Sequence, residues 1–120
     1  MGAQMRSKYR AVPIDTADGH FDSVGEYARW QDLKLLQRGG VITGLKRQVK
    51  FELIPKQKTK DGKTVPSVDY VADFRYYDTR KNEWVTEDFK GMRTDVYKLK
   101  KKLMLFRWGI EIYETGRTDL

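Results

Sequence analysis

A half-buried β-strand is predicted by the stretch Val68-Asp69-Tyr70-Val71-Ala72-Asp73-Phe74-Arg75-Tyr76-Tyr77. Apolar side chains occupy every second position, and on a strand they share one face: Val68, Tyr70, Ala72, Phe74 and Tyr76. Asp73 lies on the other face. The alternation places this segment in a sheet and leaves the carboxylate of Asp73 to be explained by its neighbours.

A second strand is predicted by Trp84-Val85-Thr86-Glu87-Asp88-Phe89-Lys90. Asp88 comes fifteen residues after Asp73 and two residues before Lys90, so Asp88 and Lys90 project from the same face of this strand. Two carboxylates and an amine on neighbouring strands can bind a divalent cation such as Mg²⁺, which keeps several waters and completes its shell with phosphate oxygens. The spacing therefore indicates phosphodiester hydrolysis, with Lys90 as a compact charge that neutralises the phosphate.

A structural interpretation stays open for the same residues. Asp73 and Asp88 could be surface ions on an edge strand with Lys90 as their salt-bridge partner, because a D-x-K triplet is short and charged residues are common. Glu87 is a neighbouring acid, although only Asp88 has the D-x-K spacing.

A third acid, Glu26, stands near the start of a helix predicted from Ser23 to about Arg38, where Gly39-Gly40 ends it. Ser23-x-x-Glu26 is a capping box, in which Glu26 would only satisfy backbone donors. Glu26 also shares its helical flank with Trp30 and Leu33, and an acid that faces protein is costly unless it is paired or bound to a metal.

This arrangement resembles the PD-(D/E)xK nuclease superfamily, with Asp73 in the first motif and Asp88-x-Lys90 in the second. Ala72 stands where that superfamily often has Pro, which shapes the backbone and not the chemistry. The chain looks like a member of a small phage and prophage family whose motif order is similar to that of archaeal-type Holliday junction resolvases and of TnsA endonucleases, which cut transposon ends. The segments that carry this resemblance are Lys8-Tyr9-Arg10, Phe21-Asp22-Ser23-x-x-Glu26, Lys50-Phe51-Glu52-Leu53-Ile54-Pro55, Tyr70-Val71-Ala72-Asp73-Phe74, Glu87-Asp88-Phe89-Lys90-Gly91 and Thr94-Asp95-Val96-Tyr97-Lys98-Leu99-Lys100.

The resemblance implies an α/β, restriction-endonuclease-like fold, a central mixed β-sheet flanked by helices in the order αβββαβ, in one domain over residues 8–120. It implies a catalytic set and a metal-binding set that share the three acids. The catalytic residues are Glu26, Asp73, Asp88 and Lys90, and the ligands of Mg²⁺, for which Mn²⁺ substitutes, are Glu26, Asp73, Asp88 and Phe89.

Other elements are expected around this core. Residues 1–7 are predicted to be a disordered tail, and Tyr9–Ile14 and Gly19–Asp22 a small N-terminal hairpin. Strands are expected at about 48–54, 67–77, 83–90 and 110–114, with a basic loop that turns at Asp61-Gly62. A second helix is expected from Asp95 to about Arg107, with Val96, Leu99, Leu103 and Phe106 on its apolar stripe.

Composition is typical of a DNA-binding protein of the cytoplasm. The 120 residues carry a net charge of +7 and no cysteine, which excludes a disulfide framework and a zinc–thiolate site. The chain contains no apolar run of the ~18 residues that a membrane span needs and no apolar signal core after its first basic residues. Seven basic residues against two acids occupy 46–63, and five basic residues with no acid occupy 98–107. Such clusters attract a phosphate backbone, or serve only as a solvated face, and the predicted DNA contacts are Lys58, Lys60, Arg93, Lys98, Lys101 and Lys102.

These observations predict a metal-dependent endonuclease that acts on branched DNA, foremost four-way junctions. A two-fold symmetric dimer is expected because resolution of a junction takes two symmetric cuts and a chain of this size has one site. Two alternatives stay open: a nicking or end-cutting nuclease of the TnsA kind, and a non-catalytic DNA-binding protein that keeps the fold.

Overall fold

The computed structural model describes residues 12–90 and 92–116. The predicted tail at residues 1–7 and the beginning of the predicted hairpin at Tyr9 lie outside the described residues. A small hairpin is confirmed, in which β1 (Ile14–Thr16) pairs antiparallel with β2 (Gly19–Phe21). Its first strand lies later than predicted, because Val12 and Pro13 are not in a strand.

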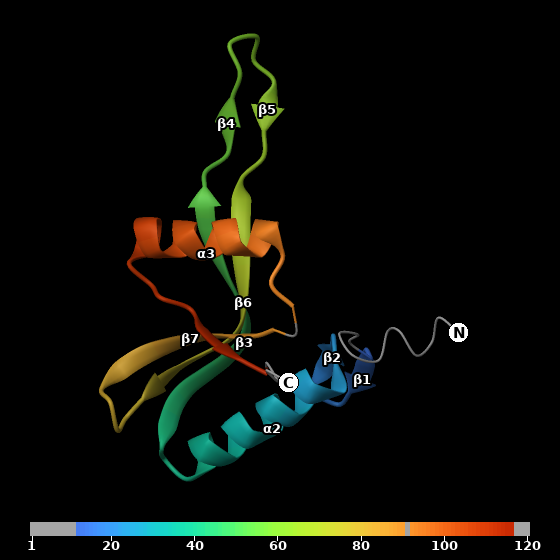
Figure 1. Ribbon diagram of the computed structural model, residues 1–120, viewed down its shortest axis with the longest axis vertical. Helices are drawn as coiled ribbons and strands as arrows, with labels where there is room; N and C mark the ends of the chain where they lie inside the picture. The colour runs from blue at the N-terminus through green and yellow to red at the C-terminus, as the bar shows by residue number, and fades with distance from the viewer. Residues whose placement is uncertain (1–11, 91, 117–120) are drawn as a thin grey trace.

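A four-stranded mixed sheet forms the centre of the molecule (Figure 1). Its strands are β3 (Ile42–Ile54), β6 (Val68–Asp78), β7 (Glu83–Phe89) and β8 (Tyr113–Thr115), in that spatial order. The pairs β3–β6 and β6–β7 are antiparallel, and β7–β8 is parallel. With the helices α2 (Val24–Arg38) and α3 (Asp95–Trp108), the main sheet follows the predicted order of helix, three strands, helix and strand.

Local signals set the ends of both helices. The Ser23 side chain accepts a hydrogen bond from the Glu26 amide and begins α2, and Thr94 caps α3 in the same way through the Tyr97 amide. Gly109, with φ of 67°, closes α3 in the left-handed conformation that glycine adopts without steric cost. The predicted helix boundaries are therefore confirmed to within one residue.

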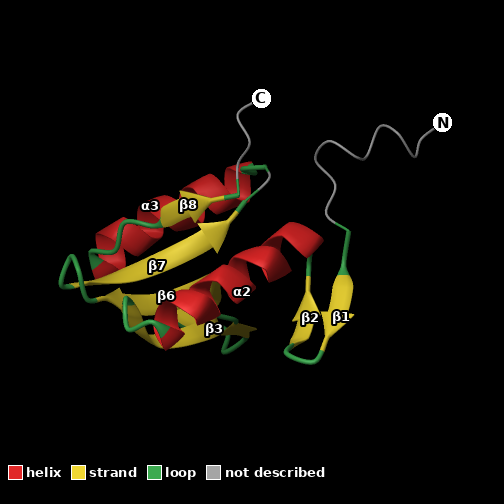
Figure 2. Ribbon diagram, turned by 90° about the horizontal axis from the view of Figure 1, so that it is seen from below, coloured by secondary structure: helices red, strands yellow, loops and turns green. Residues whose placement is uncertain are grey.

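Both helices pack against the apolar face of β6, as its core contacts show. Figure 2 gives the view of the sheet and the two helices from below. Tyr70 and Ala72 of β6 pack with Tyr97 and Met104 of α3. Further along the same strand face, Phe74 and Tyr76 pack with Leu33 of α2. The apolar alternation of β6 thus supplies two adjoining cores.

The predicted apolar stripe of α3 is wrong at three of its four residues. Val96, Leu99 and Phe106 are exposed, Phe106 to 87%, whereas Leu103 packs against the core. The buried residues of α3 are Tyr97 and Met104. Tyr97 is held toward the sheet because its hydroxyl donates to Glu114 Oε2 at 2.7 Å. A polar contact with β8 therefore turns the helix, which periodicity alone does not reveal.

Two strand boundaries also differ from the prediction. Strand β3 begins at Ile42 and not near residue 48. The alternation of side chains does not reveal its first part, because a register shift between Thr43 and Lys46 interrupts the pairing with β6. Strand β8 begins at Tyr113 and not at residue 110, and pairs with the end of β7.

The predicted basic loop is an ordered hairpin that extends the β3–β6 pair away from the body (Figure 1). We call residues 55–67 the basic arm. Strands β4 (Gln57–Lys58) and β5 (Thr64–Val65) pair antiparallel within it. At its tip the Thr59 amide donates to the Lys63 carbonyl at 2.9 Å, and the Gly62 amide donates to the Thr59 carbonyl at 3.0 Å.

No helix within residues 12–90 and 92–116 combines the length and the apolar character that a membrane crossing requires.

Candidate active site

The candidate site lies where β6 and β7 separate. Their ladder ends at the pair Phe74–Glu87, and β7 continues beyond it by pairing with β8. Beyond that pair the Asp73 side chain joins the two strands, because its Oδ2 accepts a hydrogen bond of 2.7 Å from the backbone N–H of Phe89. Asp73 is thereby fixed against the segment that carries Asp88 and Lys90.

Asp88 is 2% exposed and is held from two sides. Its Oδ2 accepts a hydrogen bond of 2.5 Å from the Tyr70 hydroxyl. Its Oδ1 forms an ion pair with Lys90 Nζ at 3.5 Å but accepts no hydrogen bond among the described atoms. A buried acceptor without a hydrogen bond is costly, so this oxygen is available to a cation or a substrate proton.

Glu26 joins these residues from α2. It is 4% exposed although it stands in the first turn, and the first turn of the helix packs on Phe89, since a Cβ at Gly25 would lie 2.9 Å from the Phe89 ring. Burial raises the pKa of Glu26, with smaller contributions from Asp22 and Asp88, while Arg47 and Lys90 act in the opposite direction. Glu26 is therefore within electrostatic reach of both Asp88 and Lys90.

Of the two hydrogen bonds of the predicted capping box, only the one to the Ser23 side chain is confirmed. The Glu26 amide bonds to Ser23 Oγ at 3.0 Å, but no hydrogen bond from the Ser23 amide to the Glu26 carboxylate is found in the described part of the chain. The nearest cation to that carboxylate is Arg47, with Nη2 4.0 Å from Oε2. The Glu26 side chain therefore takes no part in capping the helix.

Burial raises the pKa of Asp73 to about 8, with further increases from the nearby charges of Asp88 and Glu26 and a partly opposing effect of the Phe89 amide. Three acids brought together on a partly dry surface disfavour full ionisation. A divalent cation would relieve this repulsion.

This shift predicts how stability depends on pH in metal-free protein. The folded-state pKa of Asp73 is about 8 and the ordinary value is 3.8, so folding favours the protonated acid. That stabilisation is complete below pH ~4 and is lost as the pH rises toward 8, by at most about 1.4 kcal/mol for each pH unit. We therefore expect Asp73→Asn to gain stability over the wild-type protein as pH rises, measured by urea unfolding with a chelator present.

Asp69→Asn, a change of another acid on β6, is the control and should leave the pH dependence unaltered. A difference between Asp73→Asn and wild type that stays constant from pH 5 to 8 would contradict the raised pKa.

Glu87 has a different role from its neighbour Asp88. It is 0% exposed, and Arg29 of α2 holds both of its oxygens, Nε to Oε2 at 2.7 Å and Nη2 to Oε1 at 3.0 Å. Tyr76 and Thr115 donate to the same carboxylate at 2.7 Å and 2.8 Å. Glu87 therefore ties α2 and β8 to β7, and Asp88 is the acid at the candidate site.

Two tyrosines of the site are not predicted by the sequence patterns, whereas the place of Gln48 ahead of the Phe51 strand does put that residue near the site. Tyr70 belongs to the apolar face of its strand, yet its hydroxyl holds Asp88, and the Tyr97 ring lies 4.7 Å from Lys90 Nζ. Gln48 adopts a left-handed φ of 53° opposite Asp73, with Nε2 3.5 Å from Asp73 Oδ1. A buried tyrosine on an otherwise apolar strand face is the one sequence signal for such a contact, because its hydroxyl needs a partner.

The predicted ligands are thus brought together without forming a complete metal cage. Within the described residues, no group of three or more His, Cys, Asp or Glu side chains has the arrangement of a metal site. Phe89 has only its backbone carbonyl to offer a cation, and its amide is engaged by Asp73. Mg²⁺ needs only one or two carboxylates, so this geometry suits that ion better than a zinc-like cage of several side chains.

The predicted DNA contacts fall into two separate groups. Arg93, Lys98, Lys101 and Lys102 line one shallow pocket of about 420 Å³ beside α3. Within this group, Arg93 and Lys101 are already paired with Glu114, at 3.2 Å and 3.0 Å. Lys58 and Lys60 lie on the basic arm, away from this pocket.

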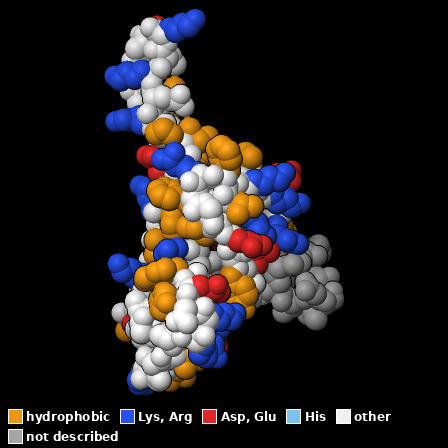
Figure 3. Space-filling model, turned by 90° about the vertical axis from the view of Figure 1, so that its left-hand side faces the viewer, with side chains coloured by type: hydrophobic (Ala, Val, Ile, Leu, Met, Phe, Trp, Pro, Cys, Tyr) orange, Lys and Arg blue, Asp and Glu red, His pale blue; other side chains and the backbone are white. Residues whose placement is uncertain are grey.

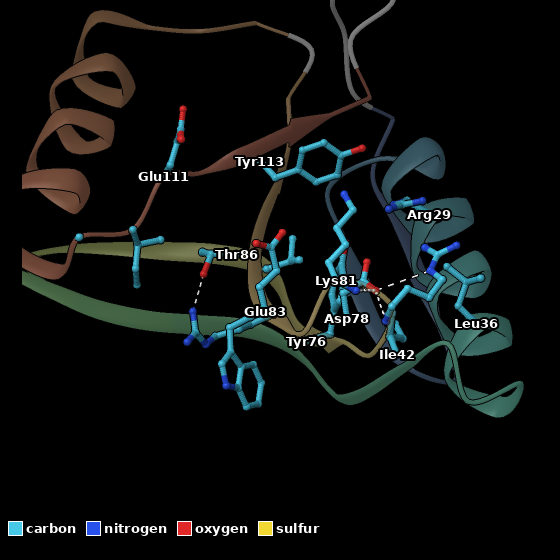
Figure 4. A pocket seen from close by; sticks show the side chains of 16 residues that line it. Arg29, Leu36, Ile42, Tyr76, Asp78, Lys81, Glu83, Thr86, Glu111 and Tyr113 are labelled. Atoms are coloured by element: carbon cyan, nitrogen blue, oxygen red, sulfur yellow. Dashed lines mark hydrogen bonds and ion pairs between the residues drawn. The ribbon is translucent and has the colours of Figure 1, made fainter.

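A different pocket, of about 430 Å³, opens beside β7 and is lined by residues that include Arg29, Asp78, Lys81, Glu83 and Tyr113 (Figure 4). It contains none of the predicted catalytic residues. Its wall includes the guanidinium of Arg29, which holds Glu87, so this pocket borders the structural ion pair and not the acid cluster.

Comparison with known families places most of the chain in one family. Residues 6–115 match the family described as "Protein of unknown function (DUF1064)", and the chain belongs to that family. No curated protein and no solved structure matches the chain significantly. The matched region includes Glu26, Asp73, Asp88, Lys90 and the basic arm.

Proposed function

We propose that this member of the DUF1064 family is a metal-dependent endonuclease that cuts branched DNA, most readily a four-way junction. The observation that carries the proposal is the convergence of Asp73, Asp88, Glu26 and Lys90 at the point where β6 and β7 separate. We also propose that the fold is of the restriction-endonuclease type, which the order of helices and strands in the main sheet supports.

The acid cluster fits a hard divalent cation such as Mg²⁺, or Mn²⁺ in its place. Asp88 keeps one buried oxygen without a hydrogen bond, and the pKa of Asp73 is raised by burial and by the other acids. Asp73 and Asp88 would hold the ion, with Glu26 and the Phe89 carbonyl as further ligands. When bound, such an ion supplies an activated water and offsets charge on the leaving oxygen.

The surrounding residues of the chain orient this chemistry. The Tyr70 hydroxyl and the Phe89 amide fix one oxygen each of Asp88 and Asp73, so the remaining oxygens have defined directions. Lys90 Nζ lies beside Asp88, and the Lys90 side chain remains 32% exposed, so its ammonium can meet a phosphate at the surface. A fixed positive charge at that place stabilises the charge that develops on the phosphate in the transition state.

A two-fold dimer would place two such sites on one junction. The exposed stripe of α3, formed by Val96, Leu99 and Phe106, supports association with a second copy, because an apolar stripe on a surface helix is typical of contact faces. Asp95 in the first turn of α3 and Arg107 in the last would face each other in an antiparallel pairing of the two helices.

One assay tests the proposal. Labelled four-way junction, nicked duplex, flap, blunt duplex and single strand are incubated with protein and Mg²⁺, and the products are separated on a denaturing gel. We expect paired cuts in the junction, at least about tenfold faster than cuts in the duplex, and none with a chelator. A supercoiled plasmid with an extruded cruciform should be linearised and not merely nicked if two sites act in one complex.

The other outcomes point to different functions. Cuts confined to nicks or duplex ends would replace junction resolution by a nicking or end-cutting activity. Binding of the same DNAs with no cut in Mg²⁺ or Mn²⁺ would identify a non-catalytic DNA-binding protein.

A further inference from the structure

The basic arm is an ordered and exposed projection from the body of the protein. Every residue from Pro55 to Pro66 is exposed, and the arm carries four lysines against one acid. Figure 3 shows basic side chains projecting from the arm into solvent at the top of the molecule. An arm with this surface adds little to a hydrophobic core, so its charge and shape suit a contact outside the chain.

The arm is held in a single shape by its own backbone. The pairs Gln57–Val65 and Lys58–Thr64 form its ladder, and Thr59 organises the turn through its hydroxyl and its backbone. Pro55 and Pro66 stand where the arm leaves β3 and enters β6 and restrict the backbone at both places. Three lysines, Lys58, Lys60 and Lys63, are thus presented on a stiff ribbon and not on a loose loop.

A two-stranded ribbon of this kind has the dimensions of a DNA groove. The major groove of B-DNA admits an α-helix or a two-stranded β-ribbon, and lysines on such a ribbon can meet phosphates on its rims. The few apolar side chains of the arm, with Val65 38% exposed, give a second protein little to bury.

The arm also stands at a defined distance from the acid cluster. Gly62 at its tip is eleven residues before Asp73, and an extended strand rises ~3.3 Å per residue, so the tip lies up to about 36 Å from Asp73 along the β3–β6 hairpin. One turn of B-DNA, about 10–10.5 base pairs, spans a similar length of about 34 Å.

We propose that the basic arm grips duplex DNA about one helical turn away from the phosphate at the acid cluster. This inference rests on the proposed function for the position of that phosphate. It makes the arm a second contact that sets the minimum duplex length the protein holds, while Lys98 and Lys102 bind closer to α3.

The test measures binding and not cleavage, so that its failure is separate from failure of the nuclease proposal. Full-length protein with Asp88→Asn is titrated, with a chelator present, against fluorescent four-way junctions whose arms are all about 20 or all about 8 base pairs long. The same titration is made with Lys58→Ala, Lys60→Ala and Lys63→Ala combined. Lys→Arg at the three positions keeps the charge, and Gln57→Ala with Thr64→Ala changes the arm without loss of charge.

On long-armed junctions, the triple alanine variant should lower the magnitude of the slope of log K against log salt by about 2.7. If affinities converge at 1 M salt, the variant then binds roughly five-hundredfold more weakly at 0.1 M salt. On short-armed junctions the Asp88→Asn parent should already bind as weakly as the triple alanine variant does on long arms. The three alanine substitutions should then change its affinity little. The arginine variant and the charge-neutral control should both bind as the parent does.

Equal affinities of parent and triple alanine variant on long arms would overturn the proposal. An equal loss on long and short arms would overturn the one-turn placement, because the lysines would then contact DNA next to the acid cluster. Circular dichroism and the arginine variant show that a loss comes from charge and not from a misfolded arm.

Discussion

Asp88→Asn is expected to abolish DNA cleavage, by about a thousandfold or more, while the protein stays folded and still binds DNA. The change removes the charge of the buried carboxylate at nearly constant volume and keeps an acceptor for the Tyr70 hydroxyl. Asp73→Asn and Lys90→Ala should each be as severe, because groups that act as a unit lose most of their effect with any one member. Single-turnover cleavage of a labelled junction in saturating protein measures the chemical step.

Glu83→Gln is the matched control for these variants, since Glu83 is an exposed acid at the opposite end of β7 from Asp88. Its cleavage rate should equal that of the wild-type protein. Wild-type rates in any of the three site variants would reject the assigned site.

Glu26→Gln separates the two roles of this residue within the same assay. The cap is kept, because it uses the Glu26 amide and the Ser23 hydroxyl, so thermal stability should not fall. If the carboxylate belongs to the site, cleavage falls by orders of magnitude or needs far more Mg²⁺. Unchanged kinetics at limiting Mg²⁺ would leave Glu26 as a helix-start residue alone.

Arg29→Met is expected to destabilise the fold more than any substitution at the acid cluster, by about 3–5 kcal/mol, because it leaves the Glu87 carboxylate buried without its cation. Glu87 is fully enclosed and would keep only the hydroxyls of Tyr76 and Thr115 as partners. Glu87→Gln should cost less, since the Arg29 side chain is 25% exposed and water can solvate its charge. Urea unfolding at pH 7 measures each free energy of unfolding.

The double variant Arg29→Met with Glu87→Gln completes the cycle. It removes both charges and should recover a large part of the loss, because the cost of a broken buried pair is mostly that of the remaining charge. If the loss in the double variant equals the sum of the losses in the two single variants, the ion pair does not couple α2 to β7.

Much of the fold could be predicted from local signals. Ser23 and Gly39 bound the first helix and Thr94 and Gly109 bound the second, because capping is decided within a few residues of each helix end. The alternation in Val68–Asp78 predicted a strand with one buried face, since side chains on a strand repeat every two residues. The spacing Asp88-x-Lys90 likewise placed an acid and an amine side by side, at 3.5 Å in the structure.

By itself, then, the sequence determined the helix limits, the central strand and the acid–lysine pair, because each depends on residues close together in the chain. Only the tertiary structure decided that Glu87 serves the ion pair with Arg29 while Asp88 faces the site, since Arg29 is 58 residues away from Glu87. It also decided that Tyr97, and not Val96 or Phe106, faces the sheet, because the contact with Glu114 of β8 turns α3. Contacts between segments that are distant in the chain determine which of several similar side chains is buried, and the local periodicity of the sequence does not contain that information.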